Sequence, residues 1–257
     1  MLLDHPVLSE RYFSPRPEKP PDPVQVRCPD GTSLNCYAAA GVPSAPTLLH
    51  FHGNGEIVAD YVPDFAEAMA RLGLNLFLAE YRGYGGSTGR PGLACMLADA
   101  EVIFQHLGLP PERVIVYGRS VGSVYAIDLA HRHPGMRGLV LESAIADPLE
   151  RILLRAHPEE LGVTLDRLER EVEAALDHQR KMKAFKGPVL IIHAHNDDLV
   201  DPSHASRLHL WAGGPDKELV LLPRGSHNSL ISKNWERYLE LLGSFAHRTR
   251  LSSGSQP

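Results

Sequence analysis

The sequence predicts an α/β protein built on a mostly parallel eight-stranded sheet with helices on both faces. Eight short apolar runs alternate with segments whose apolar residues recur at helical spacing. Continuous apolar strand runs are typical of parallel strands, because helices cover such a sheet on both sides. The chain has 257 residues, which is enough for one large core in a single domain.

The strand candidates follow one another along the whole chain. Two of them, 24–28 and 34–39, flank Pro29-Asp30-Gly31 and predict an antiparallel hairpin at one edge of the sheet. The other six are apolar runs at 47–51, 76–79, 114–117, 139–141, 189–192 and 219–222. Helices are expected at 57–72, 92–107 and 121–131.

One segment interrupts this alternation. Residues from about 147 to 186 are amphipathic and charge-rich and contain no strand candidate, so we expect a short helical lid inserted into a domain that spans 24–250. Residues 1–23 are expected to form a proline-rich N-terminal arm, because 14–23 cannot form a helix or a central strand. The small, polar tail at 251–257 is expected to be disordered.

The composition and the first residues indicate in which cellular compartment the protein is expected and whether it is expected to bind nucleic acid or a membrane. The net charge is −5 and no basic patch stands out, so nucleic acid is not expected as a partner. The first residues do not resemble a signal peptide, and no apolar run approaches the ~20 residues that span a bilayer. A cytoplasmic protein without stable membrane insertion is expected. Three cysteines do not suggest a disulfide framework, although Cys28 and Cys36 could face each other across the hairpin.

The strongest chemical signal is Gly118-Arg119-Ser120-Val121-Gly122. It follows the strand candidate VIVY and opens an apolar helix, which is the arrangement that a nucleophile elbow requires. A tight turn there lifts a serine hydroxyl above the sheet, and glycines on both sides let the neighbouring backbone approach closely. Ser120 is therefore the candidate nucleophile.

A serine hydroxyl becomes an effective nucleophile when a base removes its proton, and a third group must orient that base. His227 is the candidate base, because it lies on the loop after the last strand candidate. Asp197 and Asp198 follow the strand candidate at 189–192; Asp197 is the first choice and Asp198 the reserve. Asp201 is a weaker choice, because Pro202 follows it and it resembles a helix cap.

Backbone N–H groups are expected to stabilise the negative oxygen of a tetrahedral intermediate. One donor is Val121, directly after the nucleophile. The other is Asn54, with Gly55 as the alternative, in the glycine-containing turn after the strand candidate at 47–51. Together these two N–H groups form the predicted oxyanion hole.

Several segments now resemble a known family. LLHFHGNGE, EYRGYGGSTGRP, VIVYGRSVGS, LVLESAIAD, VLIIHAHNDDLVDP and GSHN occur in that order and are similar to the small α/β-hydrolase-domain serine hydrolases, which include carboxylesterase-like and acyl-protein-thioesterase-like members. The resemblance runs from Val24 to Ala246 and implies the α/β-hydrolase fold. It also implies that Asp197 is the catalytic acid.

The implied activity is hydrolysis of a carboxylic ester or thioester through an acyl-enzyme. The substrate would be a small molecule or an acylated partner, with no cofactor and no metal. The sequence leaves the oligomeric state undetermined. Arg119 departs from many relatives, and two roles are open for it: pairing with a carboxylate of the sheet or lid, or binding an anionic group of the substrate. Arg82 is expected to join loops through Glu80 or Glu142.

The sequence also leaves other functions open. His193 and His195, with Asp197 and Asp198, are spaced like ligands of a metal hydrolase. A catalytically silent binding protein could share the fold. Peptidase and acyltransferase activities share the acyl-enzyme step and use the same three side chains.

Overall fold

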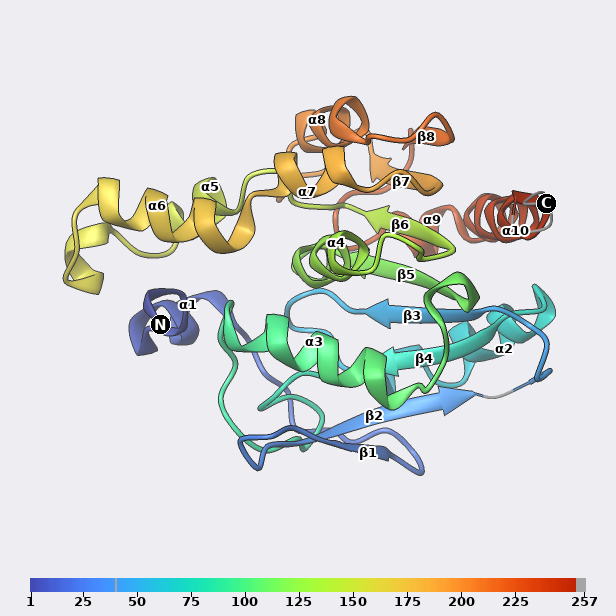
Figure 1. Ribbon diagram of the computed structural model, residues 1–257, viewed down its shortest axis with the longest axis horizontal. Helices are drawn as coiled ribbons and strands as arrows, with labels where there is room; N and C mark the ends of the chain where they lie inside the picture. The colour runs from blue at the N-terminus through green and yellow to red at the C-terminus, as the bar shows by residue number, and fades with distance from the viewer. Residues whose placement is uncertain (40, 253–257) are drawn as a thin grey trace.

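The computed structural model describes residues 1–39 and 41–252 and contains one eight-stranded sheet (Figure 1). Its strands are ordered β1-β2-β4-β3-β5-β6-β7-β8. Their bounds are β1 Val24–Arg27, β2 Ser33–Ala39, β3 Thr47–Phe51, β4 Asn75–Ala79, β5 Val114–Arg119, β6 Gly138–Glu142, β7 Val189–Ala194 and β8 Lys217–Leu222. The predicted mostly parallel eight-stranded sheet is confirmed.

Strand direction separates one edge of the sheet from the rest. β1 pairs with β2, and β2 with β4, in antiparallel register, whereas every pairing from β4 through β3 to β8 is parallel. The carboxyl ends of the parallel strands therefore lie at a common edge, which faces left in Figure 1. Ligand and catalytic groups of open α/β sheets lie on the loops at this edge.

Helices cover both faces of the sheet, as predicted. Side chains of α3, α4 and α8 pack into the core on one face, and those of α2, α9 and α10 pack on the other. The bounds are α1 Pro6–Tyr12, α2 Asp64–Arg71, α3 Cys95–His106, α4 Gly122–Arg132, α5 Pro148–Leu153, α6 Leu165–Leu176, α7 His178–Ala184, α8 Ser203–Trp211, α9 Leu230–Lys233 and α10 Trp235–Ser252. Short 3₁₀ helices occupy η1 Leu2–Asp4, η2 Val58–Tyr61, η3 Pro111–Arg113 and η4 Pro158–Leu161.

The two cores explain the apolar strand runs. In β5, Val114 and Val116 pack with the α3 and α4 side, whereas Ile115 and Tyr117 pack with the α2 and α10 side. Because both faces are buried, the strand shows no alternation of apolar and polar residues.

One expected helix is divided in two. The apolar spacing predicts a helix over 57–72, but the structure has η2 and then α2, with Pro63 between them. Proline lacks the N–H that a continuous helix needs and disfavours helical backbone at the residue before it. Pro63 therefore ends the first turn and α2 begins at Asp64.

The insertion at 147–186 is helical and contains α5, η4, α6 and α7. In Figure 1, α5 and α6 extend past the carboxyl ends of the strands, above α1. A bidentate ion pair joins Arg11 of α1 to Glu160 of η4, with both N–O distances at 2.8 Å. The insertion and the N-terminal helix thus lie over the same edge of the sheet.

The first 23 residues differ from the expected arm. Residues 14–23 lack regular structure, but Leu3, Leu8, Tyr12 and Phe13 are buried in the core on the α3 and α4 side. Their burial makes the N-terminal segment part of the domain. Of the tail at 251–257, residues 251 and 252 end α10, and 253–257 lie outside the described residues.

The three cysteines are free thiols. Cys36 lies opposite Val24 in the β1–β2 register, so it does not face Cys28 across the hairpin as the spacing suggested. The Cys28 thiol instead donates to Asp99 at 3.2 Å. Within the described part of the chain, no helix is both long enough and apolar enough to cross a membrane.

Candidate active site

Ser120 occupies the turn between β5 and α4. Its φ is +50°, a left-handed backbone conformation that residues other than glycine rarely adopt. Two backbone hydrogen bonds hold the turn: Ser120 N–H donates to Glu142 O at 2.9 Å, and Ser123 N–H donates to Ser120 O at 3.0 Å. Unusual backbone of this kind persists where the surrounding structure fixes it, and it occurs often at active sites.

The flanking glycines are required by close packing. A Cβ on Gly118 would lie 2.6 Å from Gly122 O, and a Cβ on Gly122 would collide with the carbonyl oxygen of Phe51 at the end of β3. Both obstacles are backbone atoms, which cannot rotate away as a side chain can. Only glycine lets the elbow, the first turn of α4 and the end of β3 pack together.

The structure brings Ser120, His227 and Asp197 into one hydrogen-bonded chain. The Ser120 hydroxyl lies 3.0 Å from His227 Nε2, within donating distance. On the other side of the ring, Nδ1 lies 2.9 and 3.0 Å from the two carboxylate oxygens of Asp197. With Nδ1 donating to Asp197, Nε2 is left free to accept the serine proton, which is the tautomer that general-base catalysis requires.

The environment keeps Asp197 ionised. Burial raises the pKa of this carboxyl, but hydrogen bonds from His227, Val200 N–H and Leu199 N–H outweigh burial and lower the pKa to about 2. The side chain is fully buried. A charged acid next to Nδ1 favours the positively charged imidazole that forms when Ser120 loses its proton.

The reserve acids have other contacts. Asp198 accepts from the backbone N–H of His227 at 3.4 Å and does not reach the ring in this structure. Asp201 accepts from Ser203 N–H at 2.9 Å just before α8, although the N-cap residue of that helix is Pro202. His193 is buried and donates to the carbonyl of Val200 at 2.8 Å, whereas His195 is exposed beyond the end of β7.

Ser120 and His227 line a cavity of about 140 Å³ together with Asn54 and Val121. Neither Asn54 N–H nor Val121 N–H has a hydrogen-bond acceptor among the described residues. Gly55 does not line this cavity. Two free N–H groups beside the nucleophile fit the predicted oxyanion hole.

The N-terminal segment holds Asn54 in place, a feature that sequence reasoning missed. The Asn54 amide donates to Tyr12 O at 2.8 Å, and its oxygen accepts from Ser14 N–H at 2.9 Å and from the Tyr84 hydroxyl at 2.7 Å. Tyr12 also lines the cavity. Apolar residues at helical spacing, Leu8 and Tyr12, are the sequence signal that this segment packs against the domain.

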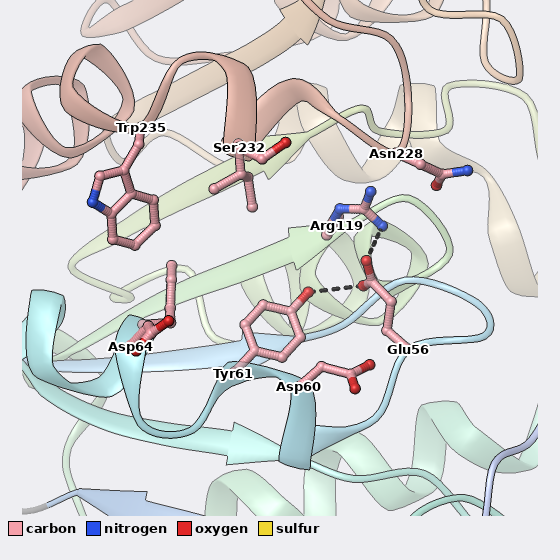
Figure 2. Close-up of a pocket in the computed structure, with 10 residues that line it drawn as sticks. Glu56, Asp60, Tyr61, Asp64, Arg119, Asn228, Ser232 and Trp235 are labelled. Atoms are coloured by element: carbon pink, nitrogen blue, oxygen red, sulfur yellow. Dashed lines mark hydrogen bonds and ion pairs between the residues drawn. The ribbon is translucent and has the colours of Figure 1, made fainter.

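Arg119 is neutralised by carboxylates on both sides. Its guanidinium contacts Glu56 at 2.5 Å and Glu142 at 3.1 Å, and it donates to the carbonyl of His227 at 2.8 Å. Figure 2 shows Arg119 and Glu56 beside Tyr61, which donates to Glu56 at 2.8 Å. Of the two roles open for Arg119, the structure has the ion pair with carboxylates, and the hydrogen bond from Arg119 to the His227 carbonyl anchors the loop that carries His227.

Arg119, Glu56 and Tyr61 also line a second cavity of about 400 Å³ (Figure 2). Arg119 and Asn228 line both cavities, but Ser120 and His227 line only the smaller one. The larger space therefore lies behind Arg119, away from the serine hydroxyl.

Arg82 joins loops as expected, but through different acids. It makes a bidentate ion pair with Asp99, at 2.6 and 2.5 Å, and a second pair with Asp30 at 3.0 Å. Glu80 is instead bonded to His52 at 2.7 Å, and Glu142 to Arg119. The partners come from α3 and the β1–β2 turn, which the sequence alone does not place near Arg82.

Comparison with known proteins identifies the family of the chain. The family model described as serine aminopeptidase S33 matches residues 43–168 and 160–234. The human α/β hydrolase domain-containing protein 17B is 30% identical over 246 residues, covering 93% of this chain and 80% of the relative. Protein bem46 of Schizosaccharomyces pombe is 29% identical over 213 residues, covering 80% and 70%.

Solved structures share the fold. A Pyrococcus furiosus esterase superposes with a TM-score of 0.72 at 18% identity, covering 92% of this chain and 99% of the esterase. A monoacylglycerol lipase of Paleococcus ferrophilus gives a TM-score of 0.65 at 18% identity, covering 84% and 99%. At this identity the likeness concerns the fold alone.

Proposed function

The chain belongs to the α/β-hydrolase family described as serine aminopeptidase S33, and we propose that it hydrolyses carboxylic esters or thioesters through an acyl-enzyme on Ser120. The observation that carries the proposal is the chain of hydrogen bonds from Ser120 Oγ through both nitrogens of His227 to Asp197. A base that is already oriented can accept the serine proton as the hydroxyl attacks.

In the first half of the reaction, Ser120 Oγ forms a bond to the acyl carbon while its proton moves to His227 Nε2. The carbonyl oxygen becomes negative and accepts hydrogen bonds from Asn54 N–H and Val121 N–H. The bond to the alcohol or thiol then breaks, and His227 gives its proton to the departing oxygen or sulfur. The acyl group remains on Ser120.

In the second half, His227 removes a proton from a water molecule that attacks the acyl carbon. The same two N–H groups stabilise the second negative oxygen. The bond to Ser120 Oγ breaks, His227 returns the proton to Ser120, and the carboxylic acid leaves. One water is consumed for each ester or thioester bond cleaved.

The cavity favours small esters. Its volume of about 140 Å³ is well below the roughly 300–1,000 Å³ of pockets that enclose drug-sized ligands. Ile145, Leu199 and Val200 supply its apolar surface. We therefore expect turnover to fall as the acyl chain lengthens from acetyl to octanoyl, since longer chains would have to displace the lid.

The residues that line the cavity favour esters and thioesters over the amide substrates of an aminopeptidase. An aminopeptidase must bind a positively charged α-amino group, for which a carboxylate is the natural partner. Among the described residues that line the cavity, none is acidic. An ester or thioester is therefore the better substrate class, and aminoacyl amides belong in the panel as the competing case.

Labelling with a fluorophosphonate probe tests the nucleophile. The wild-type protein should react at one residue and lose esterase activity in proportion, because the probe traps an activated serine. Ser120→Ala should neither be labelled nor hydrolyse 4-nitrophenyl acetate above background, a loss of roughly 10⁴- to 10⁶-fold. Labelling of Ser120→Ala at the wild-type rate would show that the active nucleophile is another residue.

Paired aspartate variants test the acid. Asp197→Asn should lower kcat by about 10⁴-fold, because the amide leaves His227 in the wrong tautomer. Asp198→Asn is the matched control, since Asp198 accepts from the backbone N–H of His227 and not from its ring. A severe loss of kcat in Asp198→Asn, with kcat retained in Asp197→Asn, would show that Asp198 is the acid that orients His227.

A further inference from the structure

Two arginines of the lid face the catalytic cavity. Arg151 lies on α5 and Arg155 just after it, and both are partly buried. They line the same cavity as Ser120 and His227. Positive charge is thus concentrated on the side of the cavity that the lid forms.

Neither arginine has an acidic partner in the part of the chain that the structure describes. Arg155 donates to the carbonyl of Arg151 at 3.0 Å, and its guanidinium lies 4.6 Å from the centre of the Tyr12 ring. Two of the neighbouring acids are occupied elsewhere: Glu150 pairs with His204 and Arg207, and Glu160 pairs with Arg11. The third, Glu159, is exposed to solvent. Across the described ranges 1–39 and 41–252, no carboxylate forms an ion pair with Arg151 or Arg155.

This arrangement leaves charge uncompensated. Burial lowers the pKa of Arg155, and the positive charge of Arg151 lowers it further, while Tyr12 acts in the opposite direction. Like charges held close together and partly removed from water are unfavourable unless an anion lies between them. Surface arginines without function are free to extend into solvent, whereas these two remain at the cavity wall.

Arg119 does not share this role. It is the third arginine at the cavity, but Glu56 and Glu142 already neutralise it. The free positive charge at the site therefore belongs to the lid arginines alone among the described residues that line the cavity.

We propose that Arg151 and Arg155 bind an anionic group, a carboxylate in the first instance, carried by a short ester or thioester whose carbonyl lies at Ser120. The inference rests on the proposed hydrolase function and narrows its substrate class. A guanidinium presents two parallel N–H groups that match the two oxygens of a carboxylate. The small cavity places this anion within a few atoms of the scissile bond.

Matched ester pairs measure the preference. For an anion on the acyl side, mono(4-nitrophenyl) glutarate is compared with 4-nitrophenyl pentanoate, which has the same chain length. For an anion on the leaving group, 4-acetoxybenzoate is compared with 4-acetoxybenzamide. Spontaneous hydrolysis is subtracted with Ser120→Ala. Wild-type kcat/KM should favour the anionic member of one pair by about 10- to 100-fold, the range of a charge-assisted contact.

Variants assign the preference to the lid arginines. Arg151→Gln with Arg155→Gln should reduce the anionic-to-neutral ratio to about one, and the double lysine variant should retain part of it because the charge remains. Arg167→Gln is the matched control, because Arg167 is an exposed arginine of the same lid. Circular dichroism confirms that each variant is folded. An unchanged ratio in the double glutamine variant, or no wild-type preference in either pair, overturns the proposal.

A binding measurement separates this inference from the proposed function. Calorimetric titration of Ser120→Ala with glutarate and with 4-hydroxybenzoate should show binding of at least one, and the double glutamine change in that background should abolish it. If glutarate binds but the wild-type protein is not labelled by the fluorophosphonate, the proposed hydrolase function is refuted and the anion site is supported. Labelling and neutral-ester turnover without anion binding or preference would refute the anion site alone.

Discussion

Replacing Arg119 by methionine should destabilise the protein by about 4 kcal/mol. Methionine keeps an unbranched, apolar side chain but removes the guanidinium that joins Glu56, Glu142 and the carbonyl of His227. Removing one partner of a buried ion pair typically costs about 3–5 kcal/mol, because the remaining charge loses its compensation. A loss of this size is a large share of the roughly 5–15 kcal/mol that stabilises a typical domain.

The size of this stability loss depends on the carboxylates that lose their partner when Arg119 is replaced. Glu142 is fully buried and would keep only hydroxyl donors, from Tyr117 and from Tyr238 at 2.8 Å. Glu56 is 25% exposed, so water would replace part of its lost partner. The double variant Arg119→Met with Glu142→Gln removes the orphaned charge at nearly constant shape and should recover about 2 kcal/mol.

Urea unfolding followed by circular dichroism at pH 7 gives these free energies, provided that the slope against urea is unchanged. Catalysis supplies a second readout: the folded Arg119→Met protein should lose 10- to 100-fold in kcat, because the loop that carries His227 loses an anchor. A cost below about 1 kcal/mol, or a double variant no more stable than the single one, would refute this account of the ion pair.

Two further predictions follow from the elbow and from the acid. Gly122→Ala should lower Tm by roughly 3–10 °C, because the added Cβ meets the backbone of Phe51. Gly135→Ala is the control, because its Cβ would lie at an ordinary 3.8 Å from Pro111. Equal losses of Tm in the two variants would contradict the steric argument. Asp197 has its pKa lowered from 3.8 to about 2, so its contribution of about 2 kcal/mol is present above pH 4 and disappears as the pH falls to 2. The stability difference between the wild type and Asp197→Asn, measured by urea unfolding from pH 6 to pH 2.5, should shrink accordingly, and a difference independent of pH would refute it.

Local pattern was enough to predict the sheet and the strand-to-helix turn that carries Ser120. Strands buried on both faces appear as continuous apolar runs, and the glycines around Ser120 mark a turn that only a strand-to-helix elbow needs. The sequence leaves two candidates for the acid, because Asp197 and Asp198 are adjacent on the same loop. Only the loop geometry decides that Asp197 meets His227 Nδ1 while Asp198 meets the backbone.

The surroundings of the site could not be predicted in the same way. Tyr12 and Ser14 bond to Asn54, but a proline-rich segment ahead of the first strand gives no indication of where it packs. Its placement depends on apolar contacts with distant parts of the core, made by Leu3 and Leu8. The sequence therefore predicts the glycine-containing turn at Asn54 but not the residues that fix its orientation.

Charge at the site shows most clearly why residue type does not determine role. Arg119 and Arg155 both line the cavity of Ser120, yet Arg119 is neutralised by Glu56 and Glu142, while Arg155 lies over the Tyr12 ring and has no ion pair within residues 1–39 and 41–252. The difference comes from partners on other elements: Glu56 precedes η2 and reaches Arg119, whereas Glu160 of η4, which follows Arg155 in the insertion, is held by Arg11 of α1. The N-terminal helix thus occupies one carboxylate of the insertion, while Arg151 and Arg155 remain at the cavity, where their positive charge is available to a substrate anion.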